Sequence, residues 1–232
     1  MISFQASATA TKVDSVAVMI LDRMSYVIGE LSSCHLSLTT QNDVIDPGNG
    51  LVSHFGSHQI YFDGSDRMLT QSYTDKGHRA TWYNGETLIY FSYDENNYAV
   101  IETPPTSLET IETINENFGI EFPASDFFYP TFTDDLINCN DQVVYVGNSV
   151  VDGKDCFHIL ASNSETVTQL WIANDAIGLP VKMMIKTKKD GQSLEYEATY
   201  TDWEINPELP LSIFEFTPPP GARAVAIQPK NY

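Results

Sequence analysis

The residues whose types and spacing come closest to a chemical site are His54 and His58. Two histidines four residues apart bind zinc when both rings lie on one face of a helix and a glutamate supplies the base. Gly56 lies between this pair, however, and no helical pattern surrounds it. We therefore interpret both side chains as surface histidines, or as histidines whose hydrogen bonds are satisfied within the fold.

Motifs for nucleophiles and cofactors give no stronger signal. The sequence has no Gly-x-Ser-x-Gly elbow, no phosphate-binding loop and no dinucleotide fingerprint. Cys34 and Cys156 lack protease-like flanks, and Asp134 and Asp135 are interpreted as acids at a helix N-terminus. We expect no catalytic residues, no metal and no cofactor. The alternative is a hydrolase whose histidine meets an acid in the folded chain, with these candidates: His54, His58, His78 and His158.

The charge of the chain restricts its partners. Lys and Arg number 12 against 31 Asp and Glu, which gives a formal net charge of -19 over 232 residues. Such a field repels phosphate backbones and anionic headgroups, so a nucleic-acid partner is not expected. The sequence contains no apolar run of about 18 residues, which predicts that the chain has no integral membrane segment.

The N-terminal segment bears on location. Residues 1–10 lack the cationic and long apolar regions of a complete signal peptide. The small residues Ala6, Ala8 and Ala10 are nevertheless typical of the border of a cleavage site, which favours an exported chain whose signal peptide has been removed. We expect residues 1–12 to form a flexible segment and residues 13–232 to form a single domain.

Three cysteines permit at most one internal disulfide. Cys139 and Cys156 flank an expected hairpin and are the pair more suited to a bridge. Against a bridge, a turn at Asp152 and Gly153 would bring Cys156 opposite the region of Val146, and disulfide geometry is strict. The bridged and the reduced states both stay open at this point.

The first half of the chain predicts a helix followed by a meander of strands. These elements would position the candidate side chains named above. Apolar residues recur at steps of three and four between Val13 and Leu31, which is typical of a helix with one buried face. Short strands are then expected at 36–38, 59–62, 67–73, 79–83, 88–93 and 98–102. Asn84 and Gly85 predict a hairpin with a type I′ turn.

The middle of the chain predicts a helical, aromatic insert. Ser107 and Thr110 are expected to cap a short helix that ends at Gly119. An aromatic cluster follows within 122–137. Because the apolar residues of this insert need a surface to cover, we expect them to lie on the concave face of the sheet.

The last third of the chain predicts further antiparallel strands at 143–146, 156–161, 168–173, 181–188 and 194–201. Alternation along the last two strands indicates one apolar, inward face, with these members: Val181, Met183, Ile185, Tyr196 and Tyr200. The chain is therefore expected to be α+β and mainly β.

Residues spread over most of the chain resemble the DUF2092 family of predicted periplasmic proteins. The residues that carry the resemblance are Tyr145, Gly147, Val151, Gly153, Cys156, His158, Gln169, Ile172, Leu179, Pro180, Lys182, Trp203, Phe214, Phe216, Pro218 and Ala222, with Tyr83, Gly85, Tyr98, Phe122 and Pro123 upstream. That family is similar to the lipoprotein-carrier superfamily of the LolA and LppX types. The resemblance implies an unclosed antiparallel β half-barrel lidded by α-helices, in a periplasmic protein.

The resemblance also implies a non-enzymatic binding protein that holds a lipid, a lipoprotein or another hydrophobic small molecule in an apolar cavity. The expected ligand contacts are Ile111, Ile114, Phe118, Phe127 and Phe128 from the lid, with Trp171, Met183 and Tyr196 from the strands. The alternative is an envelope scaffold, or protein-interaction module, whose aromatic residues fill the half-barrel and leave no space for a ligand.

Overall fold

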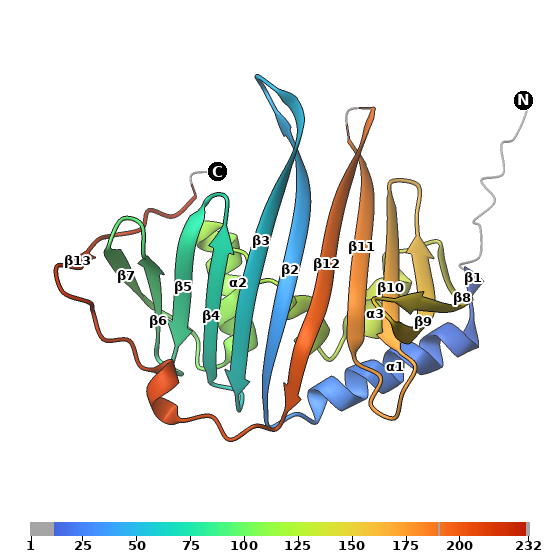
Figure 1. Ribbon diagram of the computed structural model, residues 1–232, viewed down its shortest axis with the longest axis horizontal. Coiled ribbons are helices and arrows are strands. Elements are labelled where there is room, and N and C mark those ends of the chain that lie inside the picture. The colour runs from blue at the N-terminus through green and yellow to red at the C-terminus, as the bar shows by residue number, and fades with distance from the viewer. Residues whose placement is uncertain (1–11, 190, 231–232) are drawn as a thin grey trace, which may run out of the picture.

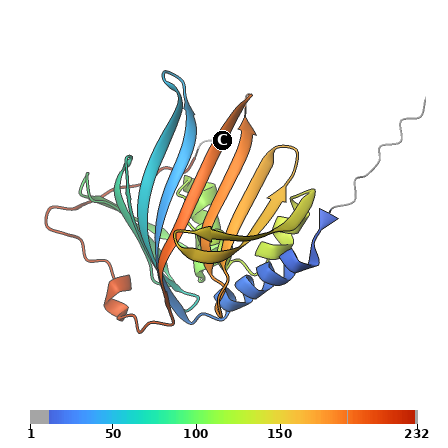
Figure 2. The ribbon, with the colours of Figure 1, turned by 45° about the vertical axis from the view of Figure 1, so that its right-hand side comes forward.

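The structure, a computed structural model, describes residues 12–189 and 191–230. Within this range one sheet of thirteen strands curves around the helices without closing into a barrel (Figure 1, Figure 2). The predicted fold, a mainly β half-barrel lidded by helices, is therefore confirmed. The N-terminal segment expected to be flexible lies outside the described residues, except for Lys12.

The sheet is antiparallel except at its two edges. Its strands pair in the order β1-β8-β9-β10-β11-β12-β2-β3-β4-β5-β6-β7-β13, and the short strands β1 and β13 pair in parallel with β8 and β7. The strands are β1 (Lys12–Val13), β2 (Ser33–Asp46), β3 (Gly50–Asp63), β4 (Arg67–Thr74), β5 (Gly77–Tyr83), β6 (Thr87–Ser92), β7 (Asn97–Glu102), β8 (Gln142–Val151), β9 (Lys154–Ser162), β10 (Thr166–Ala173), β11 (Pro180–Lys189), β12 (Gln192–Ile205) and β13 (Arg223–Ala224).

The first helix follows the predicted apolar stripe. Helix α1 (Ser15–Gly29) begins after Asp14, whose side chain accepts a hydrogen bond from the Val16 backbone N–H at 2.9 Å. Its buried face consists of Ala17, Ile20, Leu21, Met24 and Ile28. This face contacts β8 and the helical insert, so α1 lies across one end of the half-barrel (Figure 2).

The helical insert lies on the concave side of the sheet (Figure 2). It comprises α2 (Ser107–Phe118), the 3-10 turn η1 (Ser125–Phe128) and α3 (Phe132–Asn138); a second 3-10 turn, η2 (Leu211–Phe214), follows later. Helix α2 ends as predicted at Gly119, which adopts the left-handed conformation at φ 70°. Its N-cap is Thr106 rather than Ser107, because the Thr106 hydroxyl accepts from the Glu109 backbone N–H at 3.3 Å.

The insert fills the middle of the half-barrel. Phe127 from η1 is 1% exposed and meets the 0% exposed Tyr200 of β12 edge to face, with ring centroids 5.2 Å apart. Ile114 of α2 and Leu38 of β2 are buried in the same core. The central part of the concave face is therefore packed protein.

One strand departs from the predicted inward face. Met183, Ile185, Tyr196 and Tyr200 pack in the main core as expected, but Val181 packs with Cys156 and Ala173 in a separate cluster. The pairing register of β10 with β11 shifts between Trp171 and Ile172. Such a bulge inserts an extra residue and reverses the alternation, so the prediction for Val181 was wrong.

The Asn84–Gly85 hairpin forms, but not through the predicted turn. A type I′ turn needs positive φ at both central residues, and of the two only Gly85 has it, at φ 91°. The Asn84 side chain instead accepts hydrogen bonds from the backbone N–H groups of Glu86 and Thr87, at 3.2 and 3.0 Å. An asparagine that bonds the backbone two residues ahead stabilises the loop in place of the tight turn.

Strands β2 and β3 are much longer than the sequence indicated. Their hairpin is paired from Ser33 with Asp63 to Asp46 with Gly50 and projects beyond its neighbours in Figure 1. Its outer part was missed because residues 39–57 are largely polar on both faces and lack an apolar alternation. The outer part of the hairpin is held instead by backbone pairing and by the Asp46 side chain, which accepts a hydrogen bond from the Gly48 backbone N–H at 2.9 Å.

A C-terminal segment, residues 206–230, passes along the outside of the sheet and returns to the lid (Figure 1). Phe216 anchors it against Trp82, with ring centroids 5.0 Å apart. Farther on, the Lys230 backbone N–H donates to Asn117 O at 2.7 Å, and its ammonium donates to Asn115 O at 3.2 Å. Because α2 has no basic residue in its own last turn, Lys230 supplies the positive charge favoured at a helix C-terminus.

The cysteines are reduced. Cys34 and Cys156 are buried, Cys139 is exposed, and all three are free thiols. Cys156 is paired with Ser149 across the β8–β9 hairpin, which answers the question left open by the sequence.

Two buried tyrosines make a matched pair for testing the core. The Tyr200 hydroxyl has no hydrogen-bond partner among the described residues, whereas that of the equally buried Tyr83 donates to Pro104 O at 2.8 Å. We expect Tyr200→Phe to leave the free energy of unfolding unchanged or raise it by up to about 1 kcal/mol, since it removes an unpaired buried hydroxyl. Tyr83→Phe should lower it by about 1 kcal/mol. Urea denaturation measures both, and an equal loss in the two variants would contradict this description of the core.

Candidate ligand-binding clefts

The larger opening lies between the lid and the upper part of the concave face. It has a volume of about 610 Å³ and is bounded by the C-terminal half of α2, the segment leading into η1, and strands β2, β3, β11 and β12. Its apolar floor is made by Ile111 and Phe122 from the insert and by Met183 and Ile185 from β11. We call this opening the acidic cleft.

Strand β3 gives the cleft a polar wall. His58 is 6% exposed, and its Nδ1 and Nε2 are hydrogen-bonded to the hydroxyls of Ser72 and Thr40, at 2.8 and 3.1 Å. Gly56 makes room for this ring, because a Cβ at that position would lie 2.7 Å from His58 Nε2. His54, two residues beyond Gly56, is paired with Asp75. The two histidines thus lie on one face of a strand, and each has its own partner.

Burial decides the protonation of His58. Desolvation lowers its pKa from the usual 6.5 to about 4, because a charged imidazole is not stabilised among neutral hydroxyls. The ring is therefore neutral at pH 7, and it can accept one hydrogen bond and donate another.

Carboxylates surround the opening of the cleft. Glu112 and Glu116 come from α2, Glu121 and Asp126 follow it, and Asp75 lies across on the β4–β5 turn. Asp126 is exposed to the cleft but otherwise enclosed by protein, and desolvation raises its pKa. These acids give the cleft its name.

The same carboxylates help to raise the pKa values of two tyrosines that line the cleft. Burial raises the pKa of Tyr196 to about 12, and Asp126 and Glu121 add to the effect. Burial also raises the pKa of Tyr129 to about 12, with further contributions from Glu112 and Asp126. The cleft therefore disfavours any additional negative charge, including that of a ligand.

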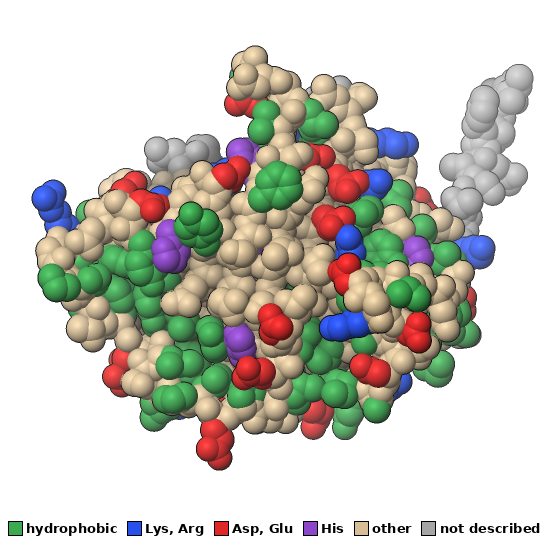
Figure 3. All heavy atoms as spheres, in the orientation of Figure 1, with side chains coloured by type: hydrophobic (Ala, Val, Ile, Leu, Met, Phe, Trp, Pro, Cys, Tyr) green, Lys and Arg blue, Asp and Glu red, His purple; other side chains and the backbone are tan. Residues whose placement is uncertain are grey.

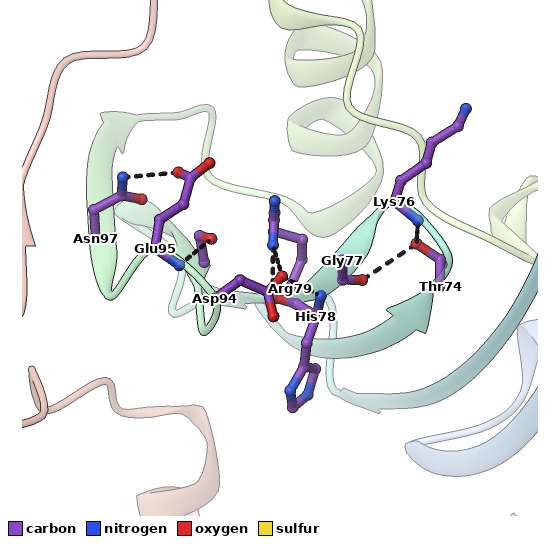
Figure 4. A network of polar contacts seen from close by, with 9 residues as sticks. Thr74, Lys76, Gly77, His78, Arg79, Asp94, Glu95 and Asn97 are labelled. Atoms are coloured by element: carbon purple, nitrogen blue, oxygen red, sulfur yellow. Dashed lines mark hydrogen bonds and ion pairs between the residues drawn. The ribbon is translucent and has the colours of Figure 1, made fainter.

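Lys76 is the one Lys or Arg among the described residues that line the acidic cleft, and a polar network fixes the turn that carries it (Figure 4). The Thr74 hydroxyl accepts from the Lys76 backbone N–H at 3.2 Å, and Asp94 accepts from the His78 backbone N–H at 2.8 Å. Asp94 also accepts from Arg79 Nη1 at 2.6 Å. Gly77 has φ 122°, and a Cβ there would collide with Asp94, so glycine is required.

A second opening lies at the opposite end of the lid. It has a volume of about 490 Å³ and is formed where the end of α1, the start of α2 and the β3–β4 turn meet. Phe62 and Phe128 form one wall, with ring centroids 4.4 Å apart. None of its described lining residues carries a charge. We call it the uncharged pocket.

The expected ligand contacts are divided among several environments. Ile111, Met183 and Tyr196 line the acidic cleft, and Phe128 lines the uncharged pocket. Ile114 and Phe127 are fully buried in the core, and Phe118 packs against it. Trp171 does not reach the concave side: it packs with Cys156 and Val181 and stacks on His158, with ring centroids 4.6 Å apart.

Sequence reasoning missed most of the polar residues of the cleft. Asp126 was not singled out, although an acid beside Phe127 and Phe128 in an aromatic run is a usable signal. Glu112 and Glu116 are four residues apart on α2, a spacing that places them on one helical face. His58 was noticed, but its position on the concave face depends on the register of the long β2–β3 hairpin.

The remaining histidines stabilise the sheet away from the lid. His35 stacks on Tyr61 and His78 on Tyr93, with centroids 4.3 and 3.9 Å apart. Figure 3 shows the outer face of the sheet, where histidine rings lie among scattered acids rather than in one cluster. Within residues 12–189 and 191–230, no group of three or more His, Cys, Asp or Glu is arranged to hold a metal ion. No helix in that range is long and apolar enough to cross a membrane.

Both clefts lie where helices cover the concave face of a curved, unclosed sheet. A family model described as "Predicted periplasmic protein (DUF2092)" matches residues 17–228, and the chain therefore belongs to the DUF2092 family. The periplasmic location expected from the sequence is confirmed. A comparison with curated proteins finds no match.

Two solved structures illustrate the similarity. An uncharacterized conserved protein from Thermus thermophilus superposes with a TM-score of 0.53 and 11% identity, covering 91% of this chain and 99% of that one. The lipoprotein LppX from Mycobacterium tuberculosis gives a TM-score of 0.50 and 14% identity, covering 85% and 98%. At these identities the likeness establishes the fold and nothing further.

The buried His58 predicts a pH dependence of stability. The unfolded chain takes up a proton near pH 6.5 and the native chain only near pH 4, so between these values the unfolded state binds more protons. We expect the free energy of unfolding to fall by roughly 3 kcal/mol from this residue as the pH is lowered across that window. Asp126 contributes in the opposite direction at the acidic end, because its native pKa is raised.

Urea denaturation between pH 7 and pH 4 measures this slope. The variant His58→Gln should flatten it, whereas His158→Gln, a change on the outer face, should leave it in place. A slope that survives in His58→Gln would show that the destabilisation originates elsewhere.

Proposed function

We propose that this protein is a periplasmic binding protein that holds an amphiphilic, hydrophobic small molecule in the acidic cleft without converting it chemically. The observation that carries the proposal is the apolar floor of the cleft, where the half-buried Ile185 lies beside the buried Ile111 and Met183. An apolar surface at the bottom of a cleft gains stability when a ligand covers it, by about 0.8 kcal/mol for each methylene buried.

The size of the cleft suits a ligand rather than a solvent-filled groove. Its volume of about 610 Å³ is within the range of roughly 300–1,000 Å³ typical of small-molecule sites. Such sites combine apolar walls with a few polar groups that orient the ligand. Here Tyr129 and Tyr196 are those groups, while His58, whose ring nitrogens are bonded to Ser72 and Thr40, shapes the wall.

The charge of the cleft defines the headgroup. Glu112, Glu116, Glu121, Asp126 and the His54-paired Asp75 line it, and Lys76 is the one Lys or Arg among the described lining residues. A carboxylate or phosphate entering this field would be repelled, whereas an ammonium group, or a neutral donor, would be attracted. The ligand that fits has an apolar body and a cationic or hydrogen-bond-donating head.

The family and the lipoprotein LppX, a protein of similar fold, support an envelope role of this kind. One fold hosts many functions, however, so the class of ligand rests on the residues of the cleft and not on the likeness.

A second candidate is an envelope scaffold that recognises other proteins and carries no ligand. The packed middle of the half-barrel, where Phe127 meets Tyr200, favours it. The two functions are distinguished by whether a hydrophobic molecule stays bound to the protein through purification.

Binding of matched twelve-carbon probes tests the proposal. We expect dodecylammonium to bind at pH 7 at least about tenfold more tightly than dodecanoate, because the carboxylates of the cleft attract a cation and repel an anion. A tenfold ratio of affinities corresponds to about 1.4 kcal/mol of binding free energy. Ile185→Trp, which fills the floor of the cleft, should abolish that binding. Titration calorimetry below the micellar concentration of each probe measures both effects.

Val150→Trp is the matched control, since Val150 is 67% exposed on β8 and takes no part in the cleft. Equal or tighter binding of dodecanoate would contradict the assignment of the headgroup. If neither probe binds and mass spectrometry of the extracted protein finds no lipid, the scaffold function is favoured.

A further inference from the structure

The uncharged pocket is a separate space from the acidic cleft. The two openings share no lining residue among those that the structure describes. Between them lies the packed core in which Ile114 and Phe127 are fully buried. A molecule in one opening therefore contacts a different set of side chains from a molecule in the other.

The lining of the pocket is apolar at its base and small and polar at its opening. Ile28 and Leu31 come from the end of α1 and just beyond it, Phe62 from β3, and Leu108 and Phe128 from the insert. The opening is formed mainly by serines and glycines. In a chain with 31 acidic residues, the absence of charge among these described lining residues distinguishes the pocket from the rest of the surface.

One polar side chain that lines this pocket is buried and unpaired among the described residues. The Ser107 side chain is 4% exposed, and its hydroxyl has no hydrogen-bond partner among the described residues. Capping of α2 is performed by Thr106, and the Ser107 backbone N–H is occupied by Ser65 O at 2.7 Å. Because buried hydroxyls are nearly always paired, an unpaired one that lines a cavity is available to a molecule bound in that cavity.

The position of Ser107 on helix α2 determines which kind of ligand atom is favoured beside it. Ser107 is the first residue of α2, where the helix dipole presents its positive end. An oxygen acceptor on the ligand is favoured there over a donor. The nearby Cys34 thiol remains protonated, since burial raises its pKa to about 12, so it adds no negative charge.

We propose that the uncharged pocket is a second binding site, which takes an uncharged apolar chain or ring carrying one acceptor oxygen, such as an ester carbonyl, and that Ser107 donates a hydrogen bond to this oxygen. The volume of about 490 Å³ is adequate for a small molecule of this class. The site differs in ligand chemistry from the acidic cleft and does not depend on that cleft being occupied.

Methyl-resolved NMR of the whole protein tests this site independently of the first. Ile28 reports on the uncharged pocket and Ile185 on the acidic cleft. We expect methyl dodecanoate to shift the Ile28 methyl signals and leave those of Ile185 in place, and dodecylammonium to do the reverse. The shifts from increasing ester concentrations give its affinity.

Two serine variants isolate the hydrogen bond. Ser107→Ala should weaken binding of methyl dodecanoate by about fivefold, the equivalent of one net hydrogen bond, with no change in the affinity for a dodecane analogue that lacks the ester. Ser65→Ala, at the exposed opening of the same pocket, should leave both affinities unchanged. Leu108→Trp, which fills the pocket, should remove the Ile28 shifts altogether.

The proposal is overturned if the ester leaves Ile28 unshifted, if dodecanoate shifts Ile28 as strongly as its methyl ester does, or if Ser107→Ala and Ser65→Ala bind the ester equally well. Failure at the acidic cleft would be seen separately, as the absence of Ile185 shifts with dodecylammonium.

Discussion

The contact between Phe127 and Tyr200 is the interaction on which the rest of the structure depends. An open sheet with one apolar concave face has to be covered, and a short 3-10 turn supplies the ring that covers its centre. Around this contact, residues of α1, α2 and most of the strands form one continuous core. Because the lid packs against the sheet at its middle, the acidic cleft and the uncharged pocket lie toward the two ends of the lid.

The two ends of the lid differ in charge because they are built from different parts of the same helix. The first turn of α2 contributes Ser107 and Leu108 to one opening, and its last two turns contribute Glu112, Asn115 and Glu116 to the other. At 1.5 Å of rise per residue, Glu112 and Glu116 lie about 8 and about 14 Å along the helix axis from Ser107. The Debye length at physiological ionic strength is about 8 Å, so the charge of Glu116 is better screened from the uncharged pocket than that of Glu112.

The sequence predicts those parts of the fold whose apolar residues repeat with a clear period. The stripe on α1 and the alternation of Met183 and Ile185 were predicted correctly for that reason. Val181 was misplaced because a bulge depends on how two strands pair, which no single-strand pattern records. The outer β2–β3 hairpin was missed since its polar residues are held by backbone pairing.

The candidate sites were less predictable than the fold, because a site is made by distant residues whose meeting depends on register. Ile111, Met183 and Tyr196 were found as apolar or aromatic residues facing inward, and they do line a cleft. The pKa values of Asp126 and His58 are shifted by desolvation, which arises only once the chain is folded. The unpaired hydroxyl of Ser107 arises because Thr106 performs the capping role instead.

The bonds from Lys230 to the end of α2 connect the lid to the outer face of the sheet. Residues 206–230 pass around the edge strand β7 and join it through β13 before they reach Asn115 and Asn117. An outward displacement of α2 that widened the acidic cleft would stretch these two bonds first. The C-terminal segment thus ties the end of α2 to the edge of the sheet, and a movement of α2 away from the sheet would have to break these two bonds.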